Sequence, residues 1–251
     1  MPTGRPRGDQ RPSYARVAAV MLETAGKSST GVAMRFRDRR EAGERLALRL
    51  RPLRGQQAVV LGLSRGGLVV AGEIADVLGA PLDILLIRRI EFSGPPATTL
   101  GAVGEGGLLV SDHSGIKRFD VTPDELTRLA GRARAELARQ VACYRHASAP
   151  VPIAGRTVVL ADDGAATGTT AHTAIRVLRA RRAGRIVLAV PVAPAHVLDR
   201  LAREVDQLVC LRSLTWMHAV RNSYRRFSAV AEAEALELVH REPRLPTEVP
   251  H

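Results

Sequence analysis

Two adjacent aspartates followed by a run of small residues form the strongest chemical signal in the sequence. Asp162 and Asp163 come directly after the apolar run Thr157–Ala161, and the segment Gly164–Thr170 (GAATGTT) follows them. A strand that ends in carboxylates places them at its carboxyl edge, where open α/β sheets bind ligands. Small residues let the backbone close around an anion, and the N–H groups of a helix that begins near Thr169 would face that anion. The pattern therefore predicts a phosphate cradle.

The two carboxylates would repel a phosphate, so they require a different partner. A sugar diol fits, because Asp162 and Asp163 can each accept a hydroxyl proton. As anions they would also stabilise positive charge that develops on a ribose ring. Backbone amides with the hydroxyls of Thr167, Thr169 and Thr170 would bind the phosphate, and each charge-assisted hydrogen bond contributes about 1.5–3 kcal/mol. An ordinary acidic turn at a strand end is the alternative interpretation.

Cations and glycines follow two other apolar runs. Arg65 supplies a positive charge, and Gly66 and Gly67 after it permit close approach of the backbone to a ligand. Arg88 and Arg89 end a later run as two further cations of a candidate site. A solvated strand end is the alternative interpretation of the second pair.

The same first turn also fits a different enzyme class. Gly62–Gly66 reads G-x-S-x-G, the nucleophile elbow of α/β-hydrolases, with Ser64 as the nucleophile. Asp163 and His218 follow in the chain order of that catalytic triad. A hydrolase, however, places several strands before its elbow, whereas only one predicted strand precedes Ser64. Hydrolysis is therefore a minor alternative.

The elements that must position these residues alternate between strand and helix. The predicted strands are 58–63, 82–87, 157–161, 185–190 and 207–211. The predicted helices between them are 66–78, 169–182 and 194–204. Continuous apolar strands covered on both faces are typical of parallel sheets. The sequence thus predicts an α/β fold with a Rossmann-like, doubly wound, mostly parallel five-stranded sheet and helices on both faces.

Additional segments surround this sheet. Residues 37–53 predict a surface helix, and Thr122 with Pro123 and Glu125 predicts an N-cap for a helix that runs to about Tyr144. Residues 91–119 hold six glycines without a helical period, which indicates a flexible loop, with or without a hairpin, that acts as a lid.

The ends of the chain are expected to lie outside the domain. Residues 1–33, rich in Pro, Gly, Arg and Ser with a weak helical stretch at 14–24, predict a mobile basic N-terminal extension. Residues 34–240 form the predicted domain, and residues 241–251 form a C-terminal tail.

Composition narrows the class of partners and the compartment. The net charge of +12 lies mostly in residues 1–54, which hold 13 basic and 5 acidic residues, so nucleic acid is a secondary hypothesis that no recognisable module supports. Cys143 and Cys210 have no metal or redox spacing, which favours a reducing cytoplasm. No apolar run has the roughly 18 residues of a membrane span.

The loop DDGAATGTT resembles the loop of type I phosphoribosyltransferases that binds phosphoribosyl pyrophosphate (PRPP). The resemblance to a bacterial group of this family runs from Met34 to Phe227, about three-quarters of the chain. In that group the first strand ends in Gly-Leu-Pro-Arg-Gly-Gly, where this chain has Ser64 in place of proline, and the second ends in Arg-Lys, here Arg88 and Arg89.

The resemblance implies that the chain transfers phosphoribosyl from PRPP to an acceptor with release of pyrophosphate. The implied PRPP-binding residues are Arg65, Gly66, Gly67, Asp162, Asp163, Ala166, Thr167, Gly168, Thr169 and Thr170. Mg²⁺ would be held mainly through PRPP, with Asp162 and Asp163 as further ligands. Arg88 and Arg89 would stabilise the leaving group under a lid that spans residue 91 to about residue 117.

The acceptor is not identified by this resemblance. In 6-oxopurine transferases an aspartate acts as general base where this chain has Ala166, so hypoxanthine and guanine are poor candidates. Glu105 on the predicted lid is a weak candidate for a proton acceptor. Trp216, Tyr224 and Phe227 would stack on a base in the hood or else pack in the core, and Arg226 replaces an acidic residue common in the group.

Two further points stay open at this stage. Some members of the fold sense PRPP and regulate transcription or RNA without turnover, and a basic N-terminal arm suits that alternative. Dimers are frequent in this fold, so a homodimer is compatible with the sequence.

Overall fold

A computed structural model describes residues 19–22, 35–92, 98–146 and 149–241 of the chain. Its strands are β1 (Ala19–Leu22), β2 (Val59–Gly62), β3 (Leu82–Ile84), β4 (Ile87–Phe92), β5 (Thr98–Gly104), β6 (Leu109–Ser111), β7 (Thr157–Ala161), β8 (Arg185–Pro194) and β9 (Gln207–Leu214). Its α-helices are α1 (Arg39–Leu50), α2 (Arg65–Leu78), α3 (His113–Arg118), α4 (Pro123–Tyr144), α5 (Thr169–Ala180), α6 (Ala195–Ala202) and α7 (Glu232–His240). Short 3₁₀ turns span Arg51–Leu53, Glu105–Gly107 and Val220–Ser223.

The central sheet is parallel throughout, in the order β1-β9-β8-β7-β2-β3. The five predicted strands are confirmed, and β1 adds a sixth at the edge beside β9. The chain moves outward from β2 to β3 in one direction and from β7 through β8 to β9 in the other. The topological switch point therefore lies between β2 and β7, where doubly wound sheets bind ligands.

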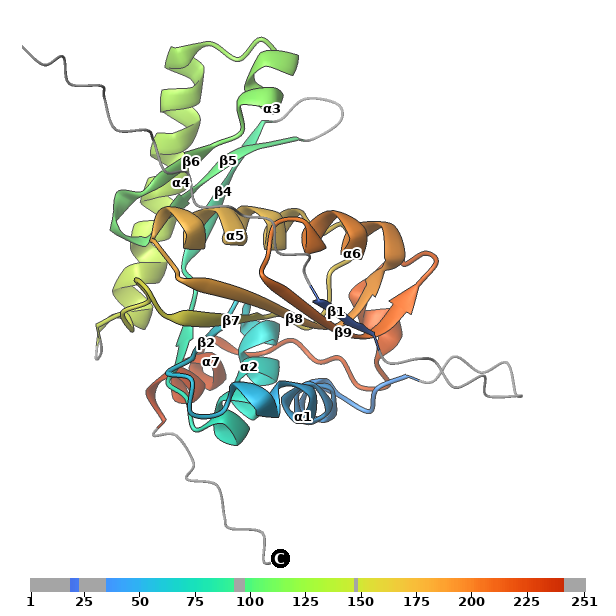
Figure 1. Cartoon of the computed structure of the whole chain (residues 1–251). Helices are drawn as coiled ribbons and strands as arrows, with labels where there is room; N and C mark the ends of the chain where they lie inside the picture. The colour runs from blue at the N-terminus through green and yellow to red at the C-terminus, as the bar shows by residue number, and fades with distance from the viewer. Residues whose placement is uncertain (1–18, 23–34, 93–97, 147–148, 242–251) are drawn as a thin grey trace, which may run out of the picture.

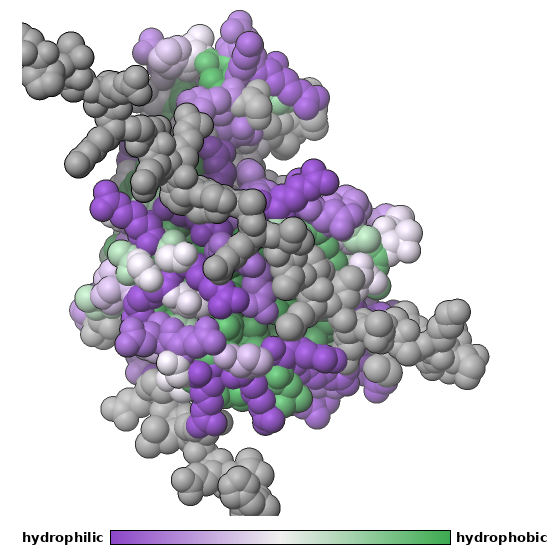
Figure 2. Space-filling model, viewed as in Figure 1, coloured by the Kyte–Doolittle hydropathy of each residue, from purple (hydrophilic) through white to green (hydrophobic). Residues whose placement is uncertain are grey.

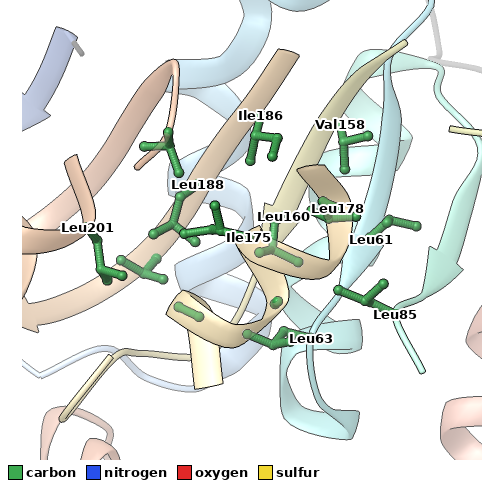
Figure 3. Close-up of a cluster of buried hydrophobic side chains, with 14 of the residues drawn as sticks. Leu61, Leu63, Leu85, Val158, Leu160, Ile175, Leu178, Ile186, Leu188 and Leu201 are labelled. Carbon is green, nitrogen blue, oxygen red and sulfur yellow. The ribbon is translucent and has the colours of Figure 1, made fainter. Parts of the chain in front are cut away.

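Helices cover both faces of this sheet, with α5 and α6 on one side and α1 and α2 on the other (Figure 1). Alternate residues of β8 enter the two cores. Ile186, Leu188 and Val190 pack with α5 and α6, as Figure 3 shows for part of that cluster. Val187 and Ala189 pack with α1 and α2. Burial of both faces explains why the strand is a continuous apolar run.

The predicted loop of residues 91–119 is largely an antiparallel sheet, so the hairpin that the sequence left open is present and the segment has more regular structure than predicted. Strands β4, β5 and β6 pair side by side, and α3 follows them, while residues 93–97 lie outside the described part. Leu100, Ala102 and Val103 are fully buried against the helices α4 and α5. Gly101 is required because a Cβ there would lie 2.2 Å from the carbonyl oxygen of Val110. A glycine at a position where two backbones lie close together replaces a side chain whose alternation would identify a strand. The sequence therefore did not reveal these strands.

Two other segments differ from, or add to, the predictions. The weak helical stretch predicted for residues 14–24 is wrong at Ala19–Leu22, where pairing with β9 makes a strand instead. The helix α7 was not predicted, and its buried residues Ala235 and Leu238 pack in the core beside α4. The predicted helix from Pro123 to Tyr144 is confirmed, capped by Thr122.

The described surface is mainly hydrophilic on the face seen in Figure 2. Among the described residues, the large hydrophobic side chains that are exposed are Leu48, Leu109 and Trp216. No helix in the described part of the chain has both the length and the apolar character that crossing a membrane requires.

Candidate functional site

The loops that follow β2 and β7 are tied together at the switch point. The hydroxyl of Ser64 donates to Asp162 Oδ1 at 2.6 Å and accepts from the amide of Gly67 at 2.9 Å, which caps the start of α2. The amide of Leu63 donates to the carbonyl of Ala161 at 2.9 Å. Ser64, which replaces the proline usual in the resembling group, therefore fixes one of the two aspartates.

The second aspartate is held from the start of α1. Arg39 Nε donates to Asp163 Oδ2 at 2.8 Å, and the two side chains are only 11% and 14% exposed. The Arg39 guanidinium also lies 3.7 Å above the ring of Phe227 and donates to the carbonyl of Ser228. Arg39 was not among the predicted site residues, since it lies 124 positions from Asp163.

Glycine is required where α2 begins beneath the aspartates. A Cβ on Gly66 would lie 2.2 Å from Asp163 Oδ2, and one on Gly67 would lie 2.8 Å from Asp162 Oδ1. The backbone of α2 thus approaches the acidic pair more closely than any other residue type allows. The start of α2 was predicted to approach a ligand, and its two glycines here also accommodate the aspartates.

Burial dominates the electrostatics of the pair. It raises the pKa of Asp162, and the charge of Asp163 raises it further. Burial also raises the pKa of Asp163, although Arg39 opposes that rise. The hydroxyl of Tyr224 donates to the carbonyl of Asp163 at 2.6 Å, and burial raises the pKa of this phenol, which therefore stays protonated.

We expect Asp162→Asn to stabilise the protein increasingly as the pH rises. In the unfolded chain Asp162 ionises near pH 3.9, whereas its pKa in the folded protein is raised. The folded state holds the proton more tightly, so ionisation of Asp162 removes stability as the pH rises from the unfolded pKa through the folded one. Asparagine keeps an acceptor for Ser64 but cannot ionise.

Chemical denaturation of both proteins from about pH 4 to pH 8 checks this. Each unit by which the pKa is raised is worth about 1.4 kcal/mol, so the free energy of unfolding should shift by at least that amount in favour of the variant. A difference that stays constant with pH would show that Asp162 ionises as freely in the folded protein as in the unfolded chain.

The phosphate turn has the backbone that a cradle needs. Gly164 and Gly168 have φ of 156° and 70°, and Gly168 is the N-cap of α5. A Cβ on Gly168 would lie 2.7 Å from Val197 of α6, so the turn packs closely against that helix. The hydroxyls of Thr167 and Thr169 bond each other at 3.2 Å. The first N–H groups of a helix have no partner within it, so the start of α5 can bind an anion.

The two candidate cations of β4 face opposite ways, as neighbours in a strand do. Arg88 pairs with Glu136 of α4 at 2.5 Å, away from the phosphate turn. Arg89 pairs with Glu91 at 2.7 Å and lines a cavity of about 680 Å³ whose wall includes Thr169. The structure therefore brings Arg89, and not Arg88, near the turn. Arg65 is exposed at the first position of α2.

Glu105 has a structural partner that the sequence did not reveal. Arg145 binds both of its carboxylate oxygens, at 2.6 and 2.9 Å, and also binds the buried Asp83 at 2.7 Å. Burial alone would lower the pKa of Arg145, but Glu105 and Asp83 outweigh it and raise that pKa. Glu105 is absent from the described wall of the cavity beside the turn. These contacts do not suit the proton acceptor that the sequence suggested.

The hood aromatics separate into one exposed ring and two packed ones. Trp216 is 62% exposed and contacts the ring of His218, with centroids 3.8 Å apart. Tyr224 is buried and packs between Phe36 and Phe227. Among the three, only Trp216 presents a largely open ring.

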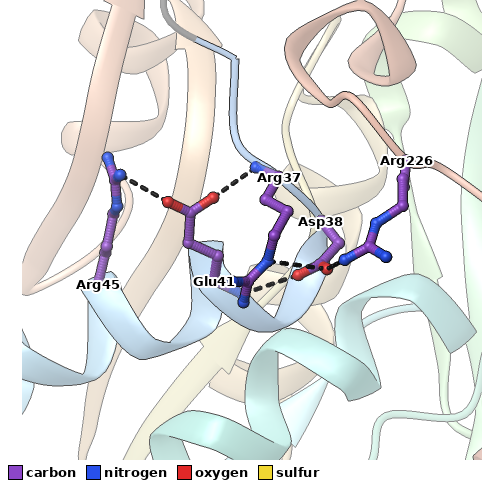
Figure 4. Close-up of polar contacts among 5 residues, drawn as sticks. All are labelled: Arg37, Asp38, Glu41, Arg45 and Arg226. Atoms are coloured by element: carbon purple, nitrogen blue, oxygen red, sulfur yellow. Dashed lines mark hydrogen bonds and ion pairs between the residues drawn. The ribbon is translucent and has the colours of Figure 1, made fainter.

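Arg226 joins the hood to the start of α1. It pairs with Asp38 at 2.7 Å, the residue whose side chain caps α1 (Figure 4). On the same helix Glu41 accepts from the backbone amide of Arg37 and from Arg45. The arginine that departs from the resembling group therefore has an acidic partner of its own.

The residues of the hydrolase alternative are not arranged as a triad. Ser64 bonds Asp162 rather than a histidine, Asp163 bonds Arg39, and His218 contacts Trp216. We expect Ser64→Ala to lower the free energy of unfolding by about 1 kcal/mol through loss of the helix cap. A fluorophosphonate should leave Ser64 unlabelled, and a covalent adduct on this serine would contradict the assignment.

The donor set suits magnesium that arrives with a phosphate ligand. In the described ranges no three acidic, histidine or cysteine side chains gather in a way that could hold a metal. Asp162 and Asp163 still offer carboxylate oxygens, which Mg²⁺ prefers, and this ion usually combines one or two carboxylates with substrate phosphates.

The chain is similar to known proteins in both sequence and fold. The family model for the phosphoribosyl transferase domain matches residues 39–220. Two Mycobacterium tuberculosis proteins, "Putative phosphoribosyl transferase MT0597" (strain CDC 1551 / Oshkosh) and "Putative phosphoribosyl transferase Rv0571c" (strain ATCC 25618 / H37Rv), are each 37% identical over 209 residues. The match covers 83% of the chain and 47% of each relative, so the chain spans about half the length of the curated relatives it matches.

A solved structure extends the likeness to the whole fold. The crystal structure of TT1426 from Thermus thermophilus is 39% identical to this chain, with a TM-score of 0.75. The match covers 82% of this chain and 98% of that one.

Proposed function

The chain belongs to the phosphoribosyltransferase family, and from this premise we propose that it binds PRPP with Mg²⁺ and transfers the phosphoribosyl group to a small acceptor. The observation that carries the proposal is the acidic pair at the switch point, directly beside the phosphate turn at the start of α5. A ligand with a 5′-phosphate and a nearby sugar diol matches both.

In the proposed complex the phosphate turn binds the 5′-phosphate. Its amides and the hydroxyls of Thr167, Thr169 and Thr170 supply the donors. Asp163 gives one carboxylate oxygen to Arg39, and the other accepts a ribose hydroxyl. Asp162 accepts from the second hydroxyl in competition with Ser64. Arg39 thereby keeps Asp163 anionic and oriented while the sugar binds.

The proposed reaction breaks the bond between the anomeric carbon and the pyrophosphate oxygen and forms a bond from that carbon to the acceptor. Arg65 and Arg89, with the backbone at Gly66 and Gly67, neutralise the departing pyrophosphate. Asp162 and Asp163 stabilise the positive charge on the ribose. Asp162 and Asp163 would hold Mg²⁺ together with PRPP, and the ion would supply further charge neutralisation. Because Ala166 cannot act as a base, the acceptor is unlike a 6-oxopurine.

Two features bear on the cellular compartment and the partners of the protein. Cys143 and Cys210 are both free thiols, which supports a reducing, cytoplasmic location. The exposed large hydrophobic side chains among the described residues are Leu48, Leu109 and Trp216. We propose the small-molecule acceptor as the main partner and a homodimer as a second hypothesis.

A screen of nucleobases and small amines for PRPP-dependent release of pyrophosphate tests the proposal. Turnover with one acceptor in the presence of Mg²⁺, and none without PRPP, is the expected result. If PRPP with Mg²⁺ raises the melting temperature but no acceptor releases pyrophosphate, the PRPP-sensing alternative is favoured. If PRPP does not bind at all, both functions are wrong.

A further inference from the structure

A cavity beside the phosphate turn contains more positive charge than the PRPP loops account for. It has a volume of about 680 Å³ and lies between α5 and the sheet of β4, β5 and β6. Its wall includes four arginines, one each from four elements: Arg89 of β4, Arg118 of α3, Arg176 of α5 and Arg200 of α6. Glu91 and Asp112 are the two carboxylates in the described wall. We call this space the arginine cavity.

We propose that the arginine cavity is a second anion site, which binds a polar small molecule carrying linked phosphate groups. This goes beyond PRPP binding, because only Arg89 and Thr169 of the residues proposed to bind PRPP line the cavity, whereas Asp162, Asp163 and Arg65 do not. It also requires neither sugar recognition nor turnover.

The arginines have capacity for such a ligand. A guanidinium carries five N–H donors in a planar fork that matches phosphate oxygens. In the described contacts Arg176 donates to the carbonyl of Ser111 at 2.7 Å, and Arg200 donates to the carbonyl of Thr167. Arg89 pairs with Glu91, which is 58% exposed, and exposed pairs of this kind contribute about 1 kcal/mol or less. A phosphate can therefore replace that partner at little cost.

The size and lining of the cavity restrict the ligand class. Small-molecule sites commonly enclose about 300–1,000 Å³, so this space exceeds the needs of one inorganic phosphate. Among the described lining residues, Val110 is the one large aliphatic side chain, and the only aromatic ring is the imidazole of His172, which pairs with Glu204 at 2.6 Å. A flat base would find little to stack on. The wall instead suits a polyphosphate or a phosphorylated polar molecule.

The cavity also shares residues with the phosphate turn. Thr169 belongs to both, and Arg200 contacts the turn through the carbonyl of Thr167. A ligand in the arginine cavity would therefore contact the outer side of the turn while the sugar site remains accessible.

Calorimetric titration of the full chain with sodium tripolyphosphate, at low salt and without PRPP, tests the proposal. We expect saturable binding that Arg118→Ala and Arg176→Gln each weaken by about tenfold or more, the usual effect of losing one charge-assisted contact. Arg118 is exposed and its described contact is with the ring of Phe119, so its loss should leave the fold intact.

Three control variants separate this site from its neighbours. Arg179 lies on α5, as Arg176 does, but it pairs with Asp206 and lies outside the cavity. The Arg179→Ala variant should therefore bind tripolyphosphate as the wild type does. Asp163→Asn should also retain binding, even if it loses PRPP. The proposal is overturned if tripolyphosphate fails to bind the wild type, or if Arg118→Ala and Arg176→Gln bind it normally. It is also overturned if Arg65→Ala is the one variant that abolishes binding, because Arg65 lies outside the cavity.

Discussion

Asp163→Asn should abolish the rise in melting temperature that PRPP with Mg²⁺ is expected to produce in the wild-type protein. The substitution keeps the shape of the side chain but removes the anion that we propose to accept a ribose hydroxyl and to stabilise charge on the ring. Losing one charge-assisted hydrogen bond costs about 1.5–3 kcal/mol, which weakens affinity roughly 10- to 150-fold. Thermal melts over a PRPP concentration series, with and without Mg²⁺, measure the effect.

The same variant should also lower stability without ligand, because Arg39 loses its half of a largely buried ion pair. Asp76→Asn is the matched control. Asp76 pairs with Arg241 at 2.9 Å, and the two side chains are 17% and 21% exposed, but neither lies near the phosphate turn. It should lose stability and keep the PRPP-induced rise. A full rise in Asp163→Asn would mean that Asp163 does not bind the sugar.

Arg145→Ala should destabilise the protein far more than the loss of an exposed ion pair would. Its guanidinium is 9% exposed and holds Asp83 and Glu105, which are 4% and 11% exposed. Removing it leaves two buried carboxylates without their cation, and breaking such a pair costs about 3–5 kcal/mol. For a domain of this size the melting temperature should fall by roughly 6–20 °C. The loss should appear in denaturant melts as well.

The loss of stability in Arg145→Ala should extend to the antiparallel sheet, because Arg145 joins the end of α4 to β3 and to the turn after β5. Arg128→Ala provides the comparison on the same helix. Arg128 is 52% exposed and pairs with Glu125 across one turn, so its loss should change stability by about 0.5 kcal/mol or less. Equal melting temperatures for the two variants would refute a structural role for the Arg145 cluster.

Much of the candidate site could be predicted from local sequence signals. The strand Thr157–Ala161 was predicted with its observed bounds, since both of its faces are buried and every position but the first is apolar. The acidic pair and the phosphate turn follow this strand directly, so their position required no knowledge of distant contacts. The capping signal at Thr122 similarly gave the start of α4, because a cap and its helix are neighbours in sequence.

The arginines of β4 show where a local error affected the site. The apolar pattern predicted an end of the second strand at Ile87 and did not distinguish Arg88 from Arg89. In the structure the chain continues as β4 to Phe92, and the alternation of side chains along a strand sends one arginine to Glu136 and the other to the cavity. If β4 had been recognised in the sequence, Arg88 and Arg89 would have been predicted to face opposite sides of the strand.

The parallel sheet, the two loops at its switch point and the residue types that we propose for binding a phosphorylated sugar all follow from the sequence alone. These depend on burial patterns and on turn residues that are close to one another in the chain. The partners of the charged groups were decided only by the tertiary structure: Arg39 for Asp163, Ser64 for Asp162 and Arg145 for Glu105. Each such pair joins residues 40 to 124 positions apart, and the sequence holds many arginines that could serve equally well. Packing alone selects which of them reaches a buried carboxylate.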